Sequence, residues 1–501
     1  MDIKALRQKI LDLAIRGKLV PQDPNDEPAS VLLERIRAEK QQMVKDGKLK
    51  PIDIKNDTVI FKGDNNLHYE KFSDGTIKCI EDEIPFDVPN NWEWCRLNSI
   101  VDVRDGTHDT PAYVDKGIPL ITSKNLIEGG IDYTNVKYIS EKDALSINER
   151  SGVNIGDILF AMIGTIGNPS MVTEDVLISI KNVALFKFTY SDNLSNYFIM
   201  YFLDYAQEDM KKRPSGGLQP FVSLNFLRTY LVPIPPVEEQ HRIASILTDS
   251  INSIRKIEIF KNEFAISLEK VKSKILDLAI RGKLVPQDPN DEPASVLLER
   301  IRAEKEELIK QGKIKRSKKE SVIFKGSDNS YYQDLPETWK LVNFKDCATL
   351  ISGRDLSKDE YNSNSIGIPY ITGASNFING NILINRWTTA PKTVSLENDI
   401  LITCKGTVGE LAINKYGEIH IARQIMAIRV YTNINLEYIK LFLESIVMEI
   451  KKSANGLIPG ISRDDMLNLS IPLPPIAEQK RIVEAIETIF TKLDEIANQV
   501  A

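Results

Sequence analysis

The chain has 501 residues, of which 42% are hydrophobic and 27% charged, enough for about three domains with real cores. Its formal net charge of −6 is mild evidence against nucleic-acid binding, although local charge matters more than the total. The four cysteines are isolated, which argues against a zinc site or a disulfide framework and fits a reducing cytosol. Because the sequence has neither an apolar signal core nor a run of about 18 apolar residues, we expect a cytoplasmic protein without a membrane segment.

An internal repeat governs the architecture. Residues 9–40 and residues 274–305 both read KILDLAIRGKLVPQDPNDEPASVLLERIRAEK, without a single difference. A repeat with so long a period indicates a duplicated two-part molecule rather than a solenoid.

Each copy predicts a helix, a loop and a second helix. In the first copy, a helical stripe of apolar residues ends at Gly17, and the prolines of PQDPNDEP make a loop. Pro28 suits the first turn of the second helix, which Asn25 or Asp26 would cap. On this local pattern alone, the segment could equally be a plain helical hairpin packed on its neighbours.

A long helix leads into the second copy. From Pro236 the chain continues to Gly282 without an intervening proline or glycine, a helix of about 45 residues that would span roughly 70 Å. Its apolar residues follow heptad spacing, which predicts one arm of a coiled coil. These positions are Ile254, Ile257, Phe264, Leu268, Val271, Ile275 and Leu278.

The C-terminal segment begins in the same way as the long helix. PPIAEQKRIV at 474–483 matches PPVEEQHRIA at 235–244, so the helical unit occurs twice, once unbroken and once divided between the two ends of the chain. This cyclic pattern predicts that the two termini lie close together and that the arms pack antiparallel. The predicted helical regions are 1–50, 236–310 and 475–501.

Two diverged segments, 84–235 and 335–474, lie between the helical regions. GIPLIT in the first segment corresponds to GIPYIT in the second, and GDILF…GTIG corresponds to NDILI…GTVG. Short β-rich runs alternate with glycine and asparagine turns, and each segment carries a helical pattern near its end. We therefore expect two α+β domains. A fixed scaffold with two different heads indicates recognition of two different targets.

These features together resemble the specificity subunit of type I DNA restriction–modification systems. The resemblance covers essentially the whole chain and rests on the GKLVPQDPNDEPASVLLERI…EK block, the I-P-x-P-P-x-x-E-Q-x-R-I start of each long helix, and the GIP-x-IT…GDI-x…G-T-x-G run. It implies an α+β fold class, with two α/β-type target-recognition domains separated by long helices. Those helices would form an antiparallel coiled coil with pseudo-twofold cyclic symmetry.

The resemblance also implies a function and a set of partners. Each recognition domain would read one half of a bipartite site in double-stranded DNA, and the helices would dock two modification (methyltransferase) subunits. Restriction subunits, which are ATP-dependent translocases and nucleases, would join them. S-adenosylmethionine, ATP and Mg²⁺ are expected on the partner subunits and none of them on this chain.

The residues themselves favour a non-catalytic role. The sequence has no G-x-x-x-x-G-K-[ST] phosphate loop, since Gly17-Lys18 is followed by Leu19, and no Asn/Asp-Pro-Pro-aromatic methyltransferase motif. Its four histidines form no H-E-x-x-H motif. No catalytic or metal-binding residue is therefore predicted.

Polar residues in turns at matching places of the two domains are candidate DNA contacts, because Arg can hold guanine bidentately and Asn and Gln suit adenine. The alternative is that they are capped surface turns and satisfied turn amides. The candidates are Arg104, Thr107, His108, Lys124, Asn125, Lys181, Asn182 and Gln219 in the first domain, and Arg354, Lys358, Ser375, Asn376, Arg423 and Gln424 in the second. The basic run 313–319 could contact the DNA backbone or be a solvated linker.

Three other functions stay open at this point. The chain could be a coiled-coil scaffold with two protein-binding heads, or a nuclease with a disguised site. It could also be the targeting subunit of a methylation-only or type II bifunctional system, which the neighbouring genes would reveal.

Overall fold

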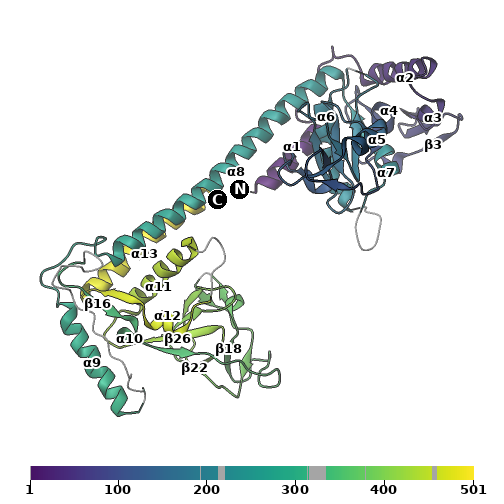
Figure 1. Ribbon diagram of the computed structural model, residues 1–501. Helices are drawn as coiled ribbons and strands as arrows, with labels where there is room; N and C mark the ends of the chain where they lie inside the picture. Colours follow the sequence, from purple (N-terminus) through teal and green to yellow (C-terminus); the bar gives the residue numbers. More distant parts are fainter. Residues whose placement is uncertain are drawn as a thin grey trace. The chain divides into compact units, whose positions relative to one another are not determined.

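The computed structural model describes residues 2–191, 193–212, 221–312, 314, 335–378, 380–453 and 460–500. Its chain divides into two compact units, Met1–Ile259 and Phe260–Ala501 (Figure 1). Each unit combines a recognition domain with two helical segments from distant parts of the sequence. The predicted α+β class, with two domains and a long helix between them in the sequence, is confirmed.

The helical part of the first unit contains α1, Ile3–Ile15, α2, Ala29–Lys45, and the first half of α8, Val237–Ile280. Helix α1 ends as predicted, with Gly17 in the left-handed region at φ 64° just beyond it. Pro28 is the residue that precedes α2 rather than part of its first turn, and no side chain caps that helix.

A buried polar cluster, the first helix-start cluster, joins the loop after α1 to the start of α8. The Glu239 carboxylate accepts hydrogen bonds from Trp92 Nε1 at 3.0 Å and from Gln22 Nε2 at 2.6 Å. One helical turn further on, Arg242 pairs with Asp26 at 2.5 Å. Asp26, a candidate helix cap in the sequence, is therefore an anchor for α8. Burial raises the pKa of Glu239, although both hydrogen bonds oppose that effect.

The second unit repeats this arrangement with residues from other parts of the chain. Its second helix-start cluster uses Trp339 Nε1, which donates to Glu478 at 2.8 Å, and Gln287, which donates to the same carboxylate. Arg481 pairs with Asp291 at 2.6 Å. The repeated block supplies the loop residues and the repeated E-Q-x-R segment supplies the helix residues, so the two sequence repeats meet each other in both units.

The helical part of the second unit contains the end of α8, α9, Ala294–Lys310, and α13, Ile476–Val500. Lys272 on α8 lies 2.7 Å from Asp494 near the end of α13, whereas Gln287 beyond α8 contacts Glu478 near its start. The two helices are therefore antiparallel within this unit. The heptad pattern placed Val271 in the packed seam, but Val271 is 46% exposed and the adjacent Lys272 faces α13.

The first recognition domain holds two four-stranded sheets, ordered β12-β11-β14-β5 and β13-β7-β10-β6, in which β13 and β7 pair in parallel and the other neighbouring strands pair antiparallel. A short pair, β15-β4, joins it to the helices. The strands are β4 Glu93–Arg96, β5 Asp102–Asp105, β6 Tyr113–Val114, β7 Ile118–Ile121, β8 Leu126–Ile127, β9 Gly130–Ile131, β10 Lys137–Ile139, β11 Ile158–Ala161, β12 Gly167–Met171, β13 Ser179–Ile180, β14 Val183–Lys187 and β15 Leu231–Ile234. Its helices are α4 Leu97–Ile100, η2 Ser123–Asn125, α5 Glu141–Ser151, α6 Asn196–Lys212 and α7 Leu224–Arg228.

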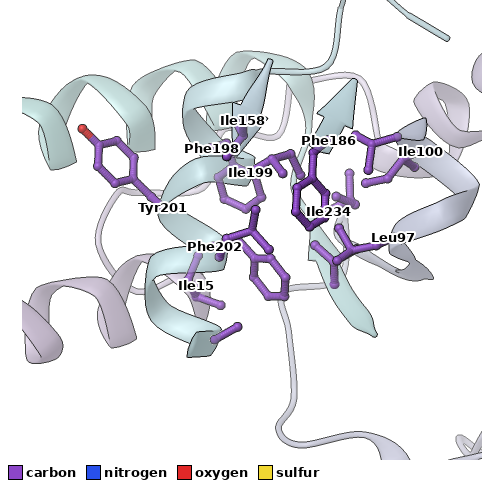
Figure 2. Packing of buried hydrophobic residues seen from close by; sticks show 14 of the residues in the cluster. Ile15, Leu97, Ile100, Ile158, Phe186, Phe198, Ile199, Tyr201, Phe202 and Ile234 are labelled. Carbon is purple, nitrogen blue, oxygen red and sulfur yellow. The ribbon is translucent and has the colours of Figure 1, made fainter. Parts of the chain in front are cut away.

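The core of this unit lies between the sheet and helix α6, and it extends into the helical part. Figure 2 shows Phe198 and Phe202 of α6 between strand residues such as Phe186 and Ile15 of α1. Burying an aromatic side chain of this size contributes roughly 1.5–3 kcal/mol. The recognition domain and the repeated helices therefore share one core, which fixes the position of the loops at the far end of the sheets.

The second recognition domain has the corresponding sheets, ordered β17-β26-β23-β24 and β21-β18-β25-β22, and the joining pair β16-β27. The strands are β16 Lys340–Asn343, β17 Ala348–Ser352, β18 Ile368–Ile371, β19 Phe377–Ile378, β20 Asn381–Ile382, β21 Trp387–Thr388, β22 Val394–Ser395, β23 Ile400–Thr403, β24 Leu411–Ile413, β25 Ile419–Ile421, β26 Ile425–Val430 and β27 Ser470–Leu473. Its helices are α10 Phe344–Cys347, η3 Ala374–Asn376, α11 Leu436–Ser453 and α12 Arg463–Leu467.

One element that the sequence did not indicate is a three-stranded sheet in the first unit, between α2 and the recognition domain. It follows the short helix α3, Pro51–Ile54, and precedes η1, Glu81–Glu83. Its strands are β1 Val59–Lys62, β2 His68–Lys71 and β3 Ile77–Cys79. Ile60 on its inner face packs against the buried Trp94.

Candidate nucleic-acid interface

Three turns that are distant in the sequence meet at one end of the first recognition domain. The turn after β5 carries Thr107, whose amide donates to the carbonyl of Ile180 at 3.0 Å, and Asn182 N donates back to Thr107 O at 3.2 Å. The turn after β7 joins them, because Ser123 Oγ donates to the carbonyl of Asn182 at 3.3 Å. We call these turns, residues 106–110, 122–125 and 181–182, the first turn cluster.

The second recognition domain brings the corresponding turns together. Arg354 N donates to the carbonyl of Ile421 at 2.9 Å, which repeats the bond from Thr107 to Ile180. The turn after β25 is one residue longer than its counterpart, since Ala422, Arg423 and Gln424 replace Lys181 and Asn182 between the equivalent strands. We call residues 353–358, 372–376 and 422–424 the second turn cluster.

A glycine allows the close approach of the backbone in each cluster. A Cβ atom on Gly106 would lie 2.2 Å from the carbonyl oxygen of Ile180, and one on Gly353 would lie 2.1 Å from that of Ala422. Both distances are far inside van der Waals contact with a rigid backbone atom. The Gly106 and Gly353 positions therefore need glycine for the turns to meet.

Most of the predicted contact residues lie at the surface of these clusters. In the first domain His108 and Lys124 are exposed, and Thr107, Lys181 and Asn182 are partly exposed. In the second, the exposed residues are Arg354, Lys358, Ser375, Arg423 and Gln424. Segments predicted separately in the sequence thus come together in both domains as sets of hydrogen-bond donors and acceptors.

Asn125 and Asn376 differ from the others, because both are buried. The side-chain oxygen of Asn376 accepts from Thr372 N at 3.0 Å, and its amide nitrogen donates to the carbonyl of Leu383 at 2.8 Å. Asn125 Oδ1 accepts from Thr122 N at 3.0 Å in the same manner. For these two side chains the alternative stated from the sequence applies: each is a turn amide whose hydrogen bonds are satisfied within the domain. They stabilise the turns and do not face solvent.

Charged side chains beside the first turn cluster form a network with His108 of the cluster. The buried Asp105 carboxylate accepts from His108 Nε2 at 2.9 Å and pairs with Arg150 at the end of α5. His108 Nδ1 lies 3.0 Å from the Asn182 side-chain oxygen. Arg104 pairs with Asp102 at 2.6 Å and donates to the carbonyl of Arg150, so its guanidinium is already engaged within the domain.

The second cluster is held by different ion pairs. Arg423 pairs with Asp355 at 2.8 Å and remains 69% exposed, so the turn is fixed while the guanidinium faces solvent. Glu360 accepts from the backbone and side chain of Ser357 and pairs with Lys392, which lowers the pKa of Glu360 to about 2. His420 is fully buried behind Arg354, with Nε2 at 2.9 Å from the Arg354 carbonyl, and burial lowers its pKa.

Two predictions lie outside the described residues. Gln219 falls in the undescribed residues 213–220, and every residue of the basic run 313–319 except Ile314 also lies outside the described ranges. The sequence did not indicate Arg150, which lies 45 residues from its partner Asp105. No spacing rule connects a helix C-terminus to a strand at such a separation.

Among the residues that the structure describes, no group of three or more His, Cys, Asp or Glu side chains could hold a metal ion. No helix within the same ranges is long and apolar enough to cross a bilayer.

Comparison with known proteins identifies the family. The model for the type I restriction modification DNA specificity domain matches residues 89–263 and 336–500. The chain is 28% identical to the EcoAI specificity subunit of Escherichia coli, covering 97% of this chain and 89% of that protein, and 28% identical to the EcoEI specificity subunit of the same organism, covering 99% and 90%.

A solved structure supports the fold. It comes from a study of complex assembly and conformational transition of the type I restriction–modification system, and it matches with a TM-score of 0.61 at 20% identity, covering 83% of this chain and 94% of that one. Two matched domains in one chain, each carrying a turn cluster on the same fold, agree with the two repeats of the family model. The chain therefore belongs to the family of type I restriction–modification DNA specificity subunits.

Proposed function

We propose that each recognition domain reads one half of a bipartite site in double-stranded DNA through its turn cluster. The observation that carries this proposal is that the two clusters share a backbone arrangement but present different side chains. A shared backbone positions both clusters similarly on a duplex, while different side chains select different bases.

Specific contacts follow from exposure and chemistry. In the second domain, Arg423 and Arg354 are suited to guanine or phosphate, and Gln424 to adenine. In the first, Asn182 and His108 are suited to base edges, with Lys124 and Lys181 on phosphates. Thr107, Ser375 and Lys358 complete the set, whereas Asn125 and Asn376 hold the turns.

We further propose that the repeated helices dock two modification subunits. In both units the identical block forms a helix on either side of an anchored loop, so two copies of one partner would meet the same surface. Restriction subunits would join this assembly in the cytoplasm. S-adenosylmethionine, ATP and Mg²⁺ would belong to the partner subunits.

Methylome sequencing of a host that carries the system tests the main proposal. We expect methylation at one bipartite motif with two different halves and a fixed spacing. The double variant Arg423→Ala, Gln424→Ala should relax only one half, because these residues belong to one cluster, and Lys181→Ala with Asn182→Ala should relax the other.

A control variant and two contrary outcomes distinguish the proposed function from its alternatives. Lys480→Ala, an exposed change on α13, should leave both halves intact. If no bipartite motif is enriched, the chain acts as a protein scaffold instead, and if both halves change together in either variant, the assignment of one cluster to each half is wrong.

A further inference from the structure

A short hairpin of the first recognition domain, formed by β8 and β9, lies against the helical part of the same unit. The Arg7 guanidinium on α1 pairs through Nη1 with Glu128 in the turn of the hairpin, and through Nη2 with Asp204 of α6 at 2.8 Å. A Cβ atom on Gly129 would lie 2.6 Å from the guanidinium of Arg255 on α8, so the same turn also meets that helix. We call the contact of Arg7 with the two carboxylates the hairpin clamp.

The hairpin continues directly from residues 122–125, one of the turns of the first turn cluster. Asn125 ends that turn and joins it to the far end of the hairpin, because its carbonyl accepts from Asp132 N at 2.8 Å and its side-chain amide donates to the Asp132 carbonyl at 3.2 Å. Strand β12 supports the hairpin as well, since Asn168 Nδ2 donates to the carbonyl of Leu126 at 2.8 Å. A shift of the hairpin on the helices would therefore shift the turn.

The second unit uses the position of Arg7 differently. The corresponding residue is Lys272, which stands two residues before the second copy of the repeated block as Arg7 stands before the first. Lys272 pairs with Asp494 of α13, so its charge joins two helices. In the first unit the same position joins a helix to the recognition domain.

The recognition-domain side of the clamp also differs between the units. In the matching hairpin, β19 and β20, the sequence has the uncharged Asn379 in place of Glu128. Glu444 of α11 corresponds to Asp204, and it pairs with Lys440 on its own helix at 2.7 Å. The charge pattern of the clamp is therefore present in the first unit and is not repeated at these positions of the second.

We propose that Arg7 is a positioning residue for recognition of the first half-site. The clamp holds the hairpin on α1 and α6, and through the hairpin it fixes where the exposed Lys124 of the adjoining turn meets DNA. A guanidinium suits this role, because its planar fork holds two carboxylates in a defined geometry. Helix α1 also carries the start of the repeated block, so the first reading turn is attached to the helices that we propose to dock a modification subunit.

This inference rests on the proposed function, and the full chain assembled with its partner subunits tests it. The probes are one duplex that carries the motif found by methylome sequencing and two duplexes in which either half of that motif is replaced. Fluorescence anisotropy gives the Kd of each, and the ratio of Kd between a replaced and the intact duplex is the selectivity for that half. We expect Arg7→Ala and Glu128→Gln each to lower the selectivity for the first half about tenfold, the size of one mismatched base pair, and to leave the second half unchanged.

The variants separate positioning from folding. Glu128 is 63% exposed, and Glu128→Gln leaves Arg7 paired with Asp204, so this variant loosens the hairpin without removing a buried group. Its matched control is Glu174→Gln, which removes an exposed charge from the groove that the hairpin lines together with α1, α6 and α8. Glu174→Gln should keep the natural selectivity for both halves, and so should Lys272→Ala in the second unit.

A double variant and the contrary outcomes complete the test. Arg7→Ala combined with Glu128→Gln should lower the selectivity no further than Arg7→Ala alone, because both changes act on one contact. The inference is overturned, while the proposed function stands, if neither single variant lowers the selectivity for the first half, if both halves lose selectivity equally, or if the two losses add. If the natural chain shows no selectivity for either half, the proposed function itself fails.

Discussion

At the scale of single residues, the same residue types have different roles depending on their solvation. Asn376 and Gln424 are both amides in the second turn cluster, yet the first is fully buried and satisfied while the second is exposed. The sequence could predict which turns are polar, because Gly and Asn residues lie between the predicted strands. It could not predict which amide faces inward, because that depends on carbonyls such as Leu383 and on the sheet that brings them close.

Glu360 gives the second turn cluster a sensitivity to acid. Lys392 and Ser357 lower its pKa from 4.5 to about 2 in the folded chain, so between these values the unfolded chain holds more protons than the folded one. The stabilising contribution is therefore complete above about pH 4.5 and is lost as the pH falls towards 2. Glu360→Gln should reduce the loss of stability between pH 5 and pH 3, measured by urea unfolding followed by circular dichroism.

Glu397→Gln is the matched control for this prediction, because Glu397 is an exposed glutamate in the same domain. It should unfold with the acid dependence of the natural chain. An acid dependence of Glu360→Gln that equals that of the natural chain would contradict the role assigned to the Lys392 contact.

At the scale of elements, the length of the long helix and its antiparallel packing in the second unit were predictable, but not every residue of its packed face was. The stretch free of proline and glycine correctly indicated a helix of about 45 residues, observed as Val237–Ile280. Heptad spacing then suggested Val271 as a seam residue, whereas Lys272 faces α13 and stacks its ammonium over Phe490. Lysine carries a long apolar stem and can occupy a helix interface, which a hydrophobic pattern does not detect.

The first helix-start cluster should carry part of the stability of the first unit. Glu239→Ala removes the acceptor for the buried Trp92 Nε1 and for Gln22, and an unsatisfied buried donor costs about 1–3 kcal/mol. Removal of a buried carboxylate offsets part of this loss, so we expect a net destabilisation of about 2 kcal/mol. Chemical unfolding followed by the fluorescence of the chain's four tryptophans, Trp92 among them, measures the change.

The adjacent Glu238 supplies the control, because it is exposed, carries the same charge and lies in the same first turn of α8. Glu238→Ala should cost less than about 0.5 kcal/mol. Equal effects of the two variants would mean that only the helix dipole is affected and that the cluster contributes nothing.

At the scale of the whole molecule, the two repeated segments of the sequence are contact partners in the structure. The 32-residue block and the E-Q-x-R segment are two separate repeats in the sequence. In the structure their side chains form ion pairs with one another, Asp26 with Arg242 in the first unit and Asp291 with Arg481 in the second. Cyclic symmetry was predictable because both segments occur twice. The predicted closeness of the two termini stays a prediction, since they belong to different units. The sheet formed by residues 59–79 was not predicted, because its strands are short and interrupted by polar turns.

The net charge of the molecule predicts its dependence on partners. A chain with a formal charge of −6 has exposed basic residues at its turn clusters but little long-range attraction for a polyanion. We expect the chain alone to bind its site weakly and the assembled complex to bind it tightly, in gel-shift titrations at equal ionic strength. Equal affinity of the two would show that the partners do not supply the missing positive surface.

The order in which the two cores become complete during synthesis follows from the helices that close them. Every residue of the main core of the first unit lies between Leu11 and Ile251, so this core can form while the rest of the chain is still on the ribosome. The main core of the second unit includes Ile482, Val483 and Ile486 of α13, which follow every other element of that unit in the sequence. Until then this core lacks the apolar residues that α13 supplies. Each core is therefore completed only when its helix-start segment has been made, Ile243 to Ile251 of α8 in the first unit and Ile482 to Ile486 of α13 in the second, so the two units can fold one after the other.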